Sequence, residues 1–125
     1  MELELRSPLD MHLHLREGDM LQKVTPFSAR PFAGAVIMPN LVSPVDSLEK
    51  VKAYRKEIES CEGTENFEPL MTLFFKNYSI EELQEAKDSI IGIKLYPAGI
   101  TTQSENGVSD FSAIQKTLGY MEELG

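Results

Sequence analysis

The sequence predicts an α/β fold built on a parallel sheet of four strands, and two observations lead to this class. Short apolar runs alternate with amphipathic segments of helical period four times along the 125 residues. Consecutive parallel strands need a long crossover between them, which a helix supplies. The strands are almost wholly apolar, as expected for strands that are covered on both faces.

The repeats follow one short extra strand at the N-terminus. Residues 1–5 alternate apolar and acidic side chains, which is typical of a strand with one face in water. The four main strands are expected near 9–15, 34–38, 68–74 and 90–95. The helices are expected near 19–29, between Asp46 and Gly63, near 79–88, and around 111–121.

Local signals mark the faces and ends of these helices. The expected buried stripes are Met20, Val24 and Phe27 in the first helix and Phe111, Ile114, Leu118 and Met121 in the last. Pro26 is expected to kink the first helix or end it early. Ser79 and Glu82 form the clearest capping box, and Asp46 with Glu49 forms a second candidate.

Two architectures contain repeated βα units of this kind: an open doubly wound sheet and part of a (β/α)8 barrel. No glycine-rich phosphate loop follows any strand, which weakens the nucleotide-binding version. The chain stops at or just after a helix, and four βα units are half a barrel. Such a half would leave two open strand edges and an exposed inner face.

Composition excludes several classes of function. The formal net charge of −8 leaves no basic patch for nucleic acid or an anionic membrane surface. The sequence has no apolar run long enough to span a membrane, and its N-terminus does not read as a signal peptide. Cys61 is the only cysteine, which fits a reducing cytoplasm and an ordinary thiol near a helix end.

The segment DMHLHLR, residues 10–16, holds both histidines of the chain on one expected strand. Strand alternation puts the polar residues Asp10, His12, His14 and Arg16 on one face. The other face carries Met11, Leu13 and Leu15, expected under the helices. Two imidazoles at i and i+2 can converge on one metal ion, and neutral imidazole suits zinc. A half-exposed strand with two surface histidines is the alternative.

Two further polar residues lie at strand ends. Lys94 is the only charged residue of a buried run, and Asn40 follows another run directly. Lys94 is either a lysine that extends to solvent or a buried amine that takes up carbon dioxide and bridges two metal ions as a carbamate. Asn40 is a turn residue or a site residue. The carboxyl ends of strands hold the active site in (β/α)8 enzymes.

Three segments carry a family resemblance, in the same order and across the whole chain: DMHLHLR, VIMPN and IKLYPAGITT. With them the sequence resembles the amidohydrolase superfamily and, within it, the dihydroorotases of the shorter, single-function bacterial type. The resemblance implies the N-terminal half of a (β/α)8 barrel with two zinc ions. It also implies the reversible cyclisation of N-carbamoyl-L-aspartate to L-dihydroorotate in pyrimidine biosynthesis, in a cytoplasmic enzyme that is a homodimer when full length.

The resemblance also implies roles for individual residues. His12 and His14 would bind the more buried zinc, and carboxylated Lys94 would bridge both metals. Arg16 and Asn40 would bind the α-carboxylate of the substrate. Thr101 and Thr102 match a mobile loop that closes over substrate, with an ordinary solvated loop as the alternative.

The sequence departs from the family by what it lacks. It has no third histidine for the second zinc, and no aspartate on an eighth strand to act as general base. We therefore expect residues 1–125 to be a truncated N-terminal half without catalytic residues of its own, inactive alone. The alternatives are another cyclic-amide hydrolase of the hydantoinase type and a non-catalytic structural partner. Retention of His12, His14 and Lys94 argues against the partner, and Arg16 with Asn40 favours a carboxylate substrate.

Overall fold

The chain forms the predicted parallel sheet, in the strand order β1-β2-β3-β4. A computed structural model describes residues 1–99, 107–108 and 114–125. The elements are β1 (Leu9–Leu13), α1 (Gly18–Ala29), β2 (Gly34–Ile37), α2 (Leu48–Glu59), β3 (Glu68–Phe74), α3 (Ile80–Ala86), the 3-10 helix η1 (Lys87–Ser89), β4 (Gly92–Lys94) and α4 (Ile114–Leu124). The predicted fold class is confirmed.

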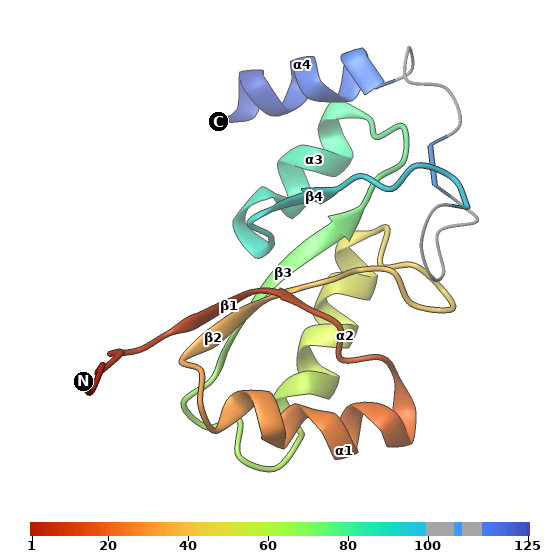
Figure 1. Cartoon of the computed structure of the whole chain (residues 1–125). Coiled ribbons are helices and arrows are strands. Elements are labelled where there is room, and N and C mark those ends of the chain that lie inside the picture. Colours follow the sequence, from red (N-terminus) through yellow and green to blue (C-terminus); the bar gives the residue numbers. More distant parts are fainter. Residues whose placement is uncertain (100–106, 109–113) are drawn as a thin grey trace.

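The hydrophobic core lies between the sheet and the helices, which follow one another along the sheet from α1 to α4 (Figure 1). The strands contribute Ala35, Ile37, Met71 and Leu73 to this core. Because side chains alternate along a strand, the residues between these point to the other face, which would be the inside of a barrel. That face is not exposed as expected, since Thr72 is 7% and Phe74 2% exposed. Tyr96 stacks on the ring of Phe74 and helps to cover it.

Of the two capping boxes predicted at helix starts, one is confirmed and one is wrong. The capping box of α3 is confirmed, with Ser79 Oγ accepting from the backbone N–H of Glu82 and the Glu82 carboxylate accepting from that of Ser79. For α2 the prediction was wrong by one residue. Ser47 is the N-cap and accepts from Lys50 N at 3.3 Å, while Asp46 pairs with Lys50 Nζ at 2.7 Å instead.

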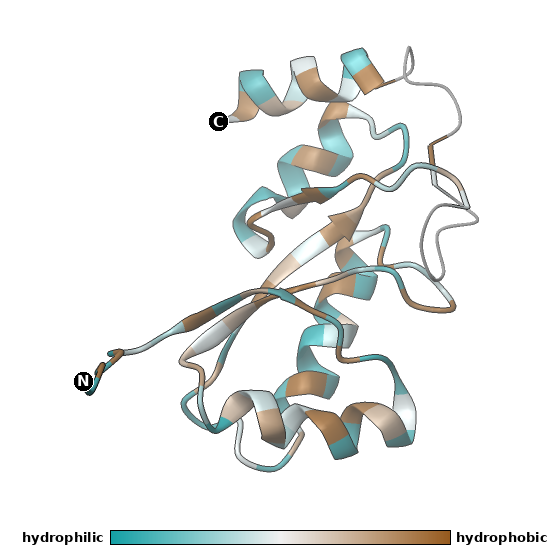
Figure 2. Cartoon of the chain, viewed as in Figure 1, coloured by the Kyte–Doolittle hydropathy of each residue, from teal (hydrophilic) through white to brown (hydrophobic). Residues whose placement is uncertain are grey.

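Helix α1 buries a face that only partly matches the one predicted, since Val24 packs against the core as expected. Its buried residues are Leu21, Thr25 and Ala29, whereas Met20 and Phe27 are exposed. Thr25 can enter the core because its hydroxyl donates to the backbone carbonyl of Leu21 at 2.7 Å. Figure 2 shows apolar and polar residues alternating around the helices, as this amphipathic packing requires.

Other element predictions need correction near the ends of the chain. Residues 1–5 form no strand and extend away from the sheet (Figure 1), with Leu3 and Leu5 exposed. An alternating pattern gives a strand only where another strand pairs with it. β4 is shorter than the predicted 90–95, and the 3-10 helix η1 occupies Lys87–Ser89 before it. In α4, Leu118 is exposed and Thr117 is buried in its place.

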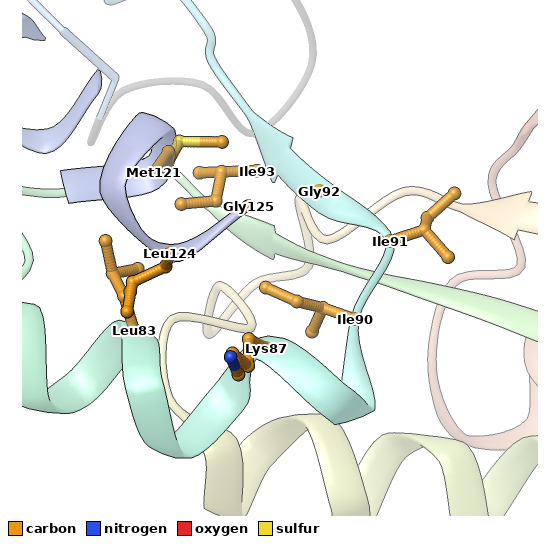
Figure 3. A pocket seen from close by; sticks show the side chains of 9 residues that line it. All are labelled: Leu83, Lys87, Ile90, Ile91, Gly92, Ile93, Met121, Leu124 and Gly125. Atoms are coloured by element: carbon orange, nitrogen blue, oxygen red, sulfur yellow. The ribbon is translucent and has the colours of Figure 1, made fainter. Parts of the chain in front are cut away.

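The helix layer contains an apolar cavity of about 130 Å³ between α3, β4 and α4 (Figure 3). Side chains such as Leu83, Ile93, Met121 and Leu124 line it. Ile93 belongs to the core side of β4, so this cavity is separated by the sheet from the side chains on the other face. None of the helices that the structure describes is long and apolar enough to cross a membrane.

Candidate functional site at the carboxyl ends of the strands

The site is built at the carboxyl ends of three parallel strands. His14 follows the last residue of β1, Asn40 lies three residues beyond β2, and Lys94 is the last residue of β4. The strands are parallel neighbours, so these ends lie along one edge of the sheet. Polar residues gathered at the carboxyl ends of βα units are the arrangement of (β/α)8 barrel enzymes.

The pairing of β1 with β2 is irregular at the histidine pair. Asp10 pairs with Ala35 and Leu13 with Ile37, so β1 has one residue more than β2 over this stretch. The Asp10 carboxylate accepts from the backbone N–H of His12 at 2.9 Å. This bulge breaks the predicted alternation. Leu15 is buried as expected, but Met11, predicted to lie under the helices, is 66% exposed.

The two imidazoles converge. His12 Nε2 and His14 Nε2 are 3.1 Å apart, with ring centroids 5.1 Å apart. Two nitrogens on one tetrahedral zinc ion at ~2.0–2.1 Å would be separated by about 3.3–3.4 Å. The pair therefore fits the spacing of two ligands on one zinc ion. Burial and then the positive charges of Arg16, His12 and Lys94 lower the pKa of His14, which favours the neutral imidazole that a metal requires.

The described part of the chain contains no cluster of three histidine, cysteine, aspartate or glutamate side chains able to hold a metal ion. Lys94 belongs to none of these residue types. Its charge acts on His14, and its Nζ lies 5.6 Å from the centre of the Tyr96 ring. Lys94 therefore lies near enough to His14 for its charge to act on that imidazole.

Asn40 is held by a residue that sequence reasoning missed. Asn40 is 1% exposed, and its Oδ1 accepts a hydrogen bond of 2.7 Å from the Tyr96 hydroxyl. Burial raises the pKa of Tyr96 to about 12, so the hydroxyl remains a donor at neutral pH. The acceptor end of the amide therefore faces Tyr96, and its donor end is directed elsewhere. The sequence signals for Tyr96 were its place two residues after Lys94 and within the segment IKLYPAGITT.

Arg16 has an unusual backbone. Its φ is +64°, in the left-handed region that costs a non-glycine residue on the order of 1–3 kcal/mol. Its charge acts on His14 and Tyr96, and also on Tyr54. Strained residues of this kind concentrate at functional sites.

Thr101 and Thr102 lie outside the described residues. The structure does describe residues that precede and follow them in the sequence. Val108 N donates to Tyr96 O at 2.7 Å, and Ala98 N donates to Val108 O at 3.0 Å. The chain thus returns to the carboxyl end of β4, directly beside Tyr96.

Fold and site together define one class: parallel βα units of the kind that build (β/α)8 barrels, with histidine, arginine, asparagine and lysine residues following or ending the strands. No family model matches the chain. It is 48% identical to the dihydroorotases of Helicobacter hepaticus and Ralstonia pickettii, matching 98% of this chain and 37% of each relative. The chain thus spans little more than a third of the curated relatives it matches.

Solved structures of dihydroorotases are also similar to this chain. The crystal structure of Campylobacter jejuni dihydroorotase matches 98% of this chain and 39% of its own, with a TM-score of 0.89 and 53% identity. Saccharomyces cerevisiae dihydroorotase in complex with 5-fluoroorotic acid matches 93% and 33%, with a TM-score of 0.82 and 38% identity. The predicted resemblance to the dihydroorotases is confirmed over the segment that the chain covers.

Proposed function

We propose that residues 1–125 form the N-terminal part of a dihydroorotase, an enzyme that interconverts N-carbamoyl-L-aspartate and L-dihydroorotate. The observation that carries the proposal is the gathering of His14, Arg16, Asn40 and Lys94 at one end of the sheet. Similarity to dihydroorotases over nearly the whole chain supports it. The remaining barrel strands, the ligands of a second zinc and the general-base aspartate would belong to the rest of the enzyme.

His12 and His14 would hold one zinc ion, and Lys94, once carboxylated, would bridge it to a second. The 3.1 Å spacing of the two Nε2 atoms supports the first assignment. The position of Lys94 beside His14 supports the second. Zinc, when bound, supplies an activated water and polarises the amide carbonyl of the substrate.

Arg16 and Asn40 would bind the α-carboxylate. Arginine offers a planar pair of donors that matches a carboxylate, and the Asn40 amide has its acceptor end occupied by Tyr96. A dianionic substrate also needs local positive charge in a chain of net charge −8. The yeast relative was solved with 5-fluoroorotic acid, a pyrimidine that carries a carboxylate.

The chain's own residues thus bind and orient, while proton transfer would fall to the aspartate elsewhere in the enzyme. Thr101 and Thr102 would contribute to a loop over the substrate. We further propose a cytoplasmic homodimer. A hydantoinase-type activity would need no site for a free carboxylate, so Arg16 and Asn40 favour dihydroorotase over it.

Lys94→Ala in the full-length enzyme tests the proposal. We expect loss of most bound zinc, measured by mass spectrometry of metals, and of most dihydroorotate hydrolysis. A short carboxylate such as acetate should restore part of the activity by replacing the carbamate. Lys52→Ala, on the exposed side of α2, is the matched control and should change neither. Full zinc content and activity in Lys94→Ala would refute the bridging role, and equal turnover of hydantoin by the wild type would refute the substrate.

A further inference from the structure

We propose that Tyr54 and Glu17 are positioning residues that set the spacing of Arg16 and Asn40. The inference rests on the proposed function, in which those two residues bind the carboxylate. The sequence alone gave neither Tyr54 nor Glu17 a role at the site.

Tyr54 holds the strained backbone of Arg16. Its hydroxyl donates a hydrogen bond of 2.8 Å to the Arg16 carbonyl, across 38 residues of sequence. Tyr54 is 4% exposed and belongs to the core packed around α2. Burial, together with the nearby Glu17 and Glu57 carboxylates, raises the pKa of Tyr54, so its hydroxyl stays protonated and continues to donate. The left-handed conformation of Arg16 is therefore fixed from a rigid helix.

Glu17 connects the segment after β1 with the segment after β2. Its carboxylate accepts from the backbone N–H of Val42 at 2.9 Å. Val42 lies two residues beyond Asn40, in a turn closed by hydrogen bonds from the N–H groups of Leu41 and Val45 to the Pro39 carbonyl. The segment after β1 is thus fastened directly to the segment after β2.

These two contacts reach the site only through the main chain. Tyr54 approaches Arg16 from the helix layer, and its hydrogen bond is to the Arg16 backbone carbonyl, while the charge of the Arg16 side chain acts on His14, Tyr96 and Tyr54 alike. Tyr54 therefore touches no reacting group. Tyr54 instead sets the position of the Arg16 guanidinium relative to the Asn40 amide. A small displacement of the guanidinium weakens recognition of a planar carboxylate.

The test is a double-mutant cycle in the full-length enzyme. Tyr54→Phe removes one hydroxyl and should lower kcat/KM for dihydroorotate about threefold to tenfold, mostly through KM, with zinc content unchanged. In an Arg16→Ala background the same change should have no further effect, because its target is already absent. Glu17→Ala, which opens no core, should shift KM in the same direction.

Tyr78→Phe is the matched control. Tyr78 is also a buried tyrosine whose hydroxyl bonds to main-chain carbonyls, at 2.6 Å from Phe74 O at the end of β3 and 3.2 Å from Asp46 O. We expect a comparable loss of thermal stability with no effect that depends on Arg16. Losses from Tyr54→Phe that persist in Arg16→Ala would overturn the inference and leave a structural role only. A wild-type enzyme without dihydroorotase activity would overturn the proposed function, and this inference with it.

Discussion

The hydrogen bond between Tyr96 and Asn40 offers a precise perturbation of the site, because one oxygen atom can be removed from it. Tyr96→Phe keeps a ring that can stack on Phe74, at a centroid distance of 5.3 Å. It deletes only the donor that lies 2.7 Å from Asn40 Oδ1. Asn40 is 1% exposed, so bulk water has little access to the acceptor that is left behind.

Leaving a buried acceptor without its donor costs about 1–3 kcal/mol. Asn40 takes part in a further interaction, so the amide is not wholly released, and we expect the lower part of the range, about 1–2 kcal/mol. If the Asn40 amide orients the substrate carboxylate, that cost appears in the transition state too. It corresponds to a fall in kcat/KM of about 5- to 30-fold.

The assay is the steady-state hydrolysis of dihydroorotate by the full-length enzyme, with zinc content and thermal unfolding measured on the same samples. Tyr120→Phe is the control, since Tyr120 lies on α4, away from the strand ends. A Tyr96→Phe enzyme that is folded and loaded with zinc, yet has unchanged kcat/KM, would show that the orientation of Asn40 does not matter to catalysis.

Three further outcomes are expected. Arg16→Lys keeps the charge but loses the planar pair of donors, so kcat/KM for dihydroorotate should fall at least about tenfold; unchanged kinetics would remove Arg16 from the site. A hydrogen bond from the Ser79 N–H holds the pKa of Glu82 below its ordinary 4.5, so its contribution to stability is present above that pH and lost as pH falls through the lower, folded value. Glu82→Gln should therefore flatten the acid limb of a thermal-unfolding profile, and an unaltered limb would contradict this. Residues 1–125 expressed alone should show no turnover and should self-associate in light scattering, because β1 and β4 are open edges of the sheet; an active monomer would refute the half-barrel interpretation.

Local signals in the sequence predicted the elements that depend on local interactions. The apolar runs of β2 and β3 are recognisable without a partner, and the Ser79 capping box lies within four residues. Predictions failed where a distant contact decides. The stripe of α1 was assigned by hydropathy to Met20, Val24 and Phe27. Val24 does pack against the core, but Met20 and Phe27 are exposed, and the core accepts Thr25 because its hydroxyl bonds within the helix.

The residues of the candidate site likewise fall into those that the sequence could single out and those that it could not. His14, Asn40 and Lys94 could be found from the sequence, because polar residues at the ends of apolar strands are unusual. Tyr96 and Tyr54 could not be assigned, since their hydroxyl partners are 56 and 38 residues away. An aromatic residue within an apolar pattern is indistinguishable from ordinary core until its partner is known.

The bulge in β1 explains why the predictions for Met11 and Asp10 failed. Strict alternation predicted that Met11 would pack under the helices, and the extra residue between Asp10 and Leu13 releases it to solvent. The same irregularity turns the Asp10 carboxylate back onto the N–H of His12, which removes Asp10 from the polar face it was predicted to share. The two imidazoles of that face stay together, with their Nε2 atoms 3.1 Å apart. A strand with perfect pairing would have satisfied the His12 N–H in the ladder and left Asp10 beside the histidines. The bulge thus uses one carboxylate to fix the backbone, and it leaves the two imidazoles in contact with each other.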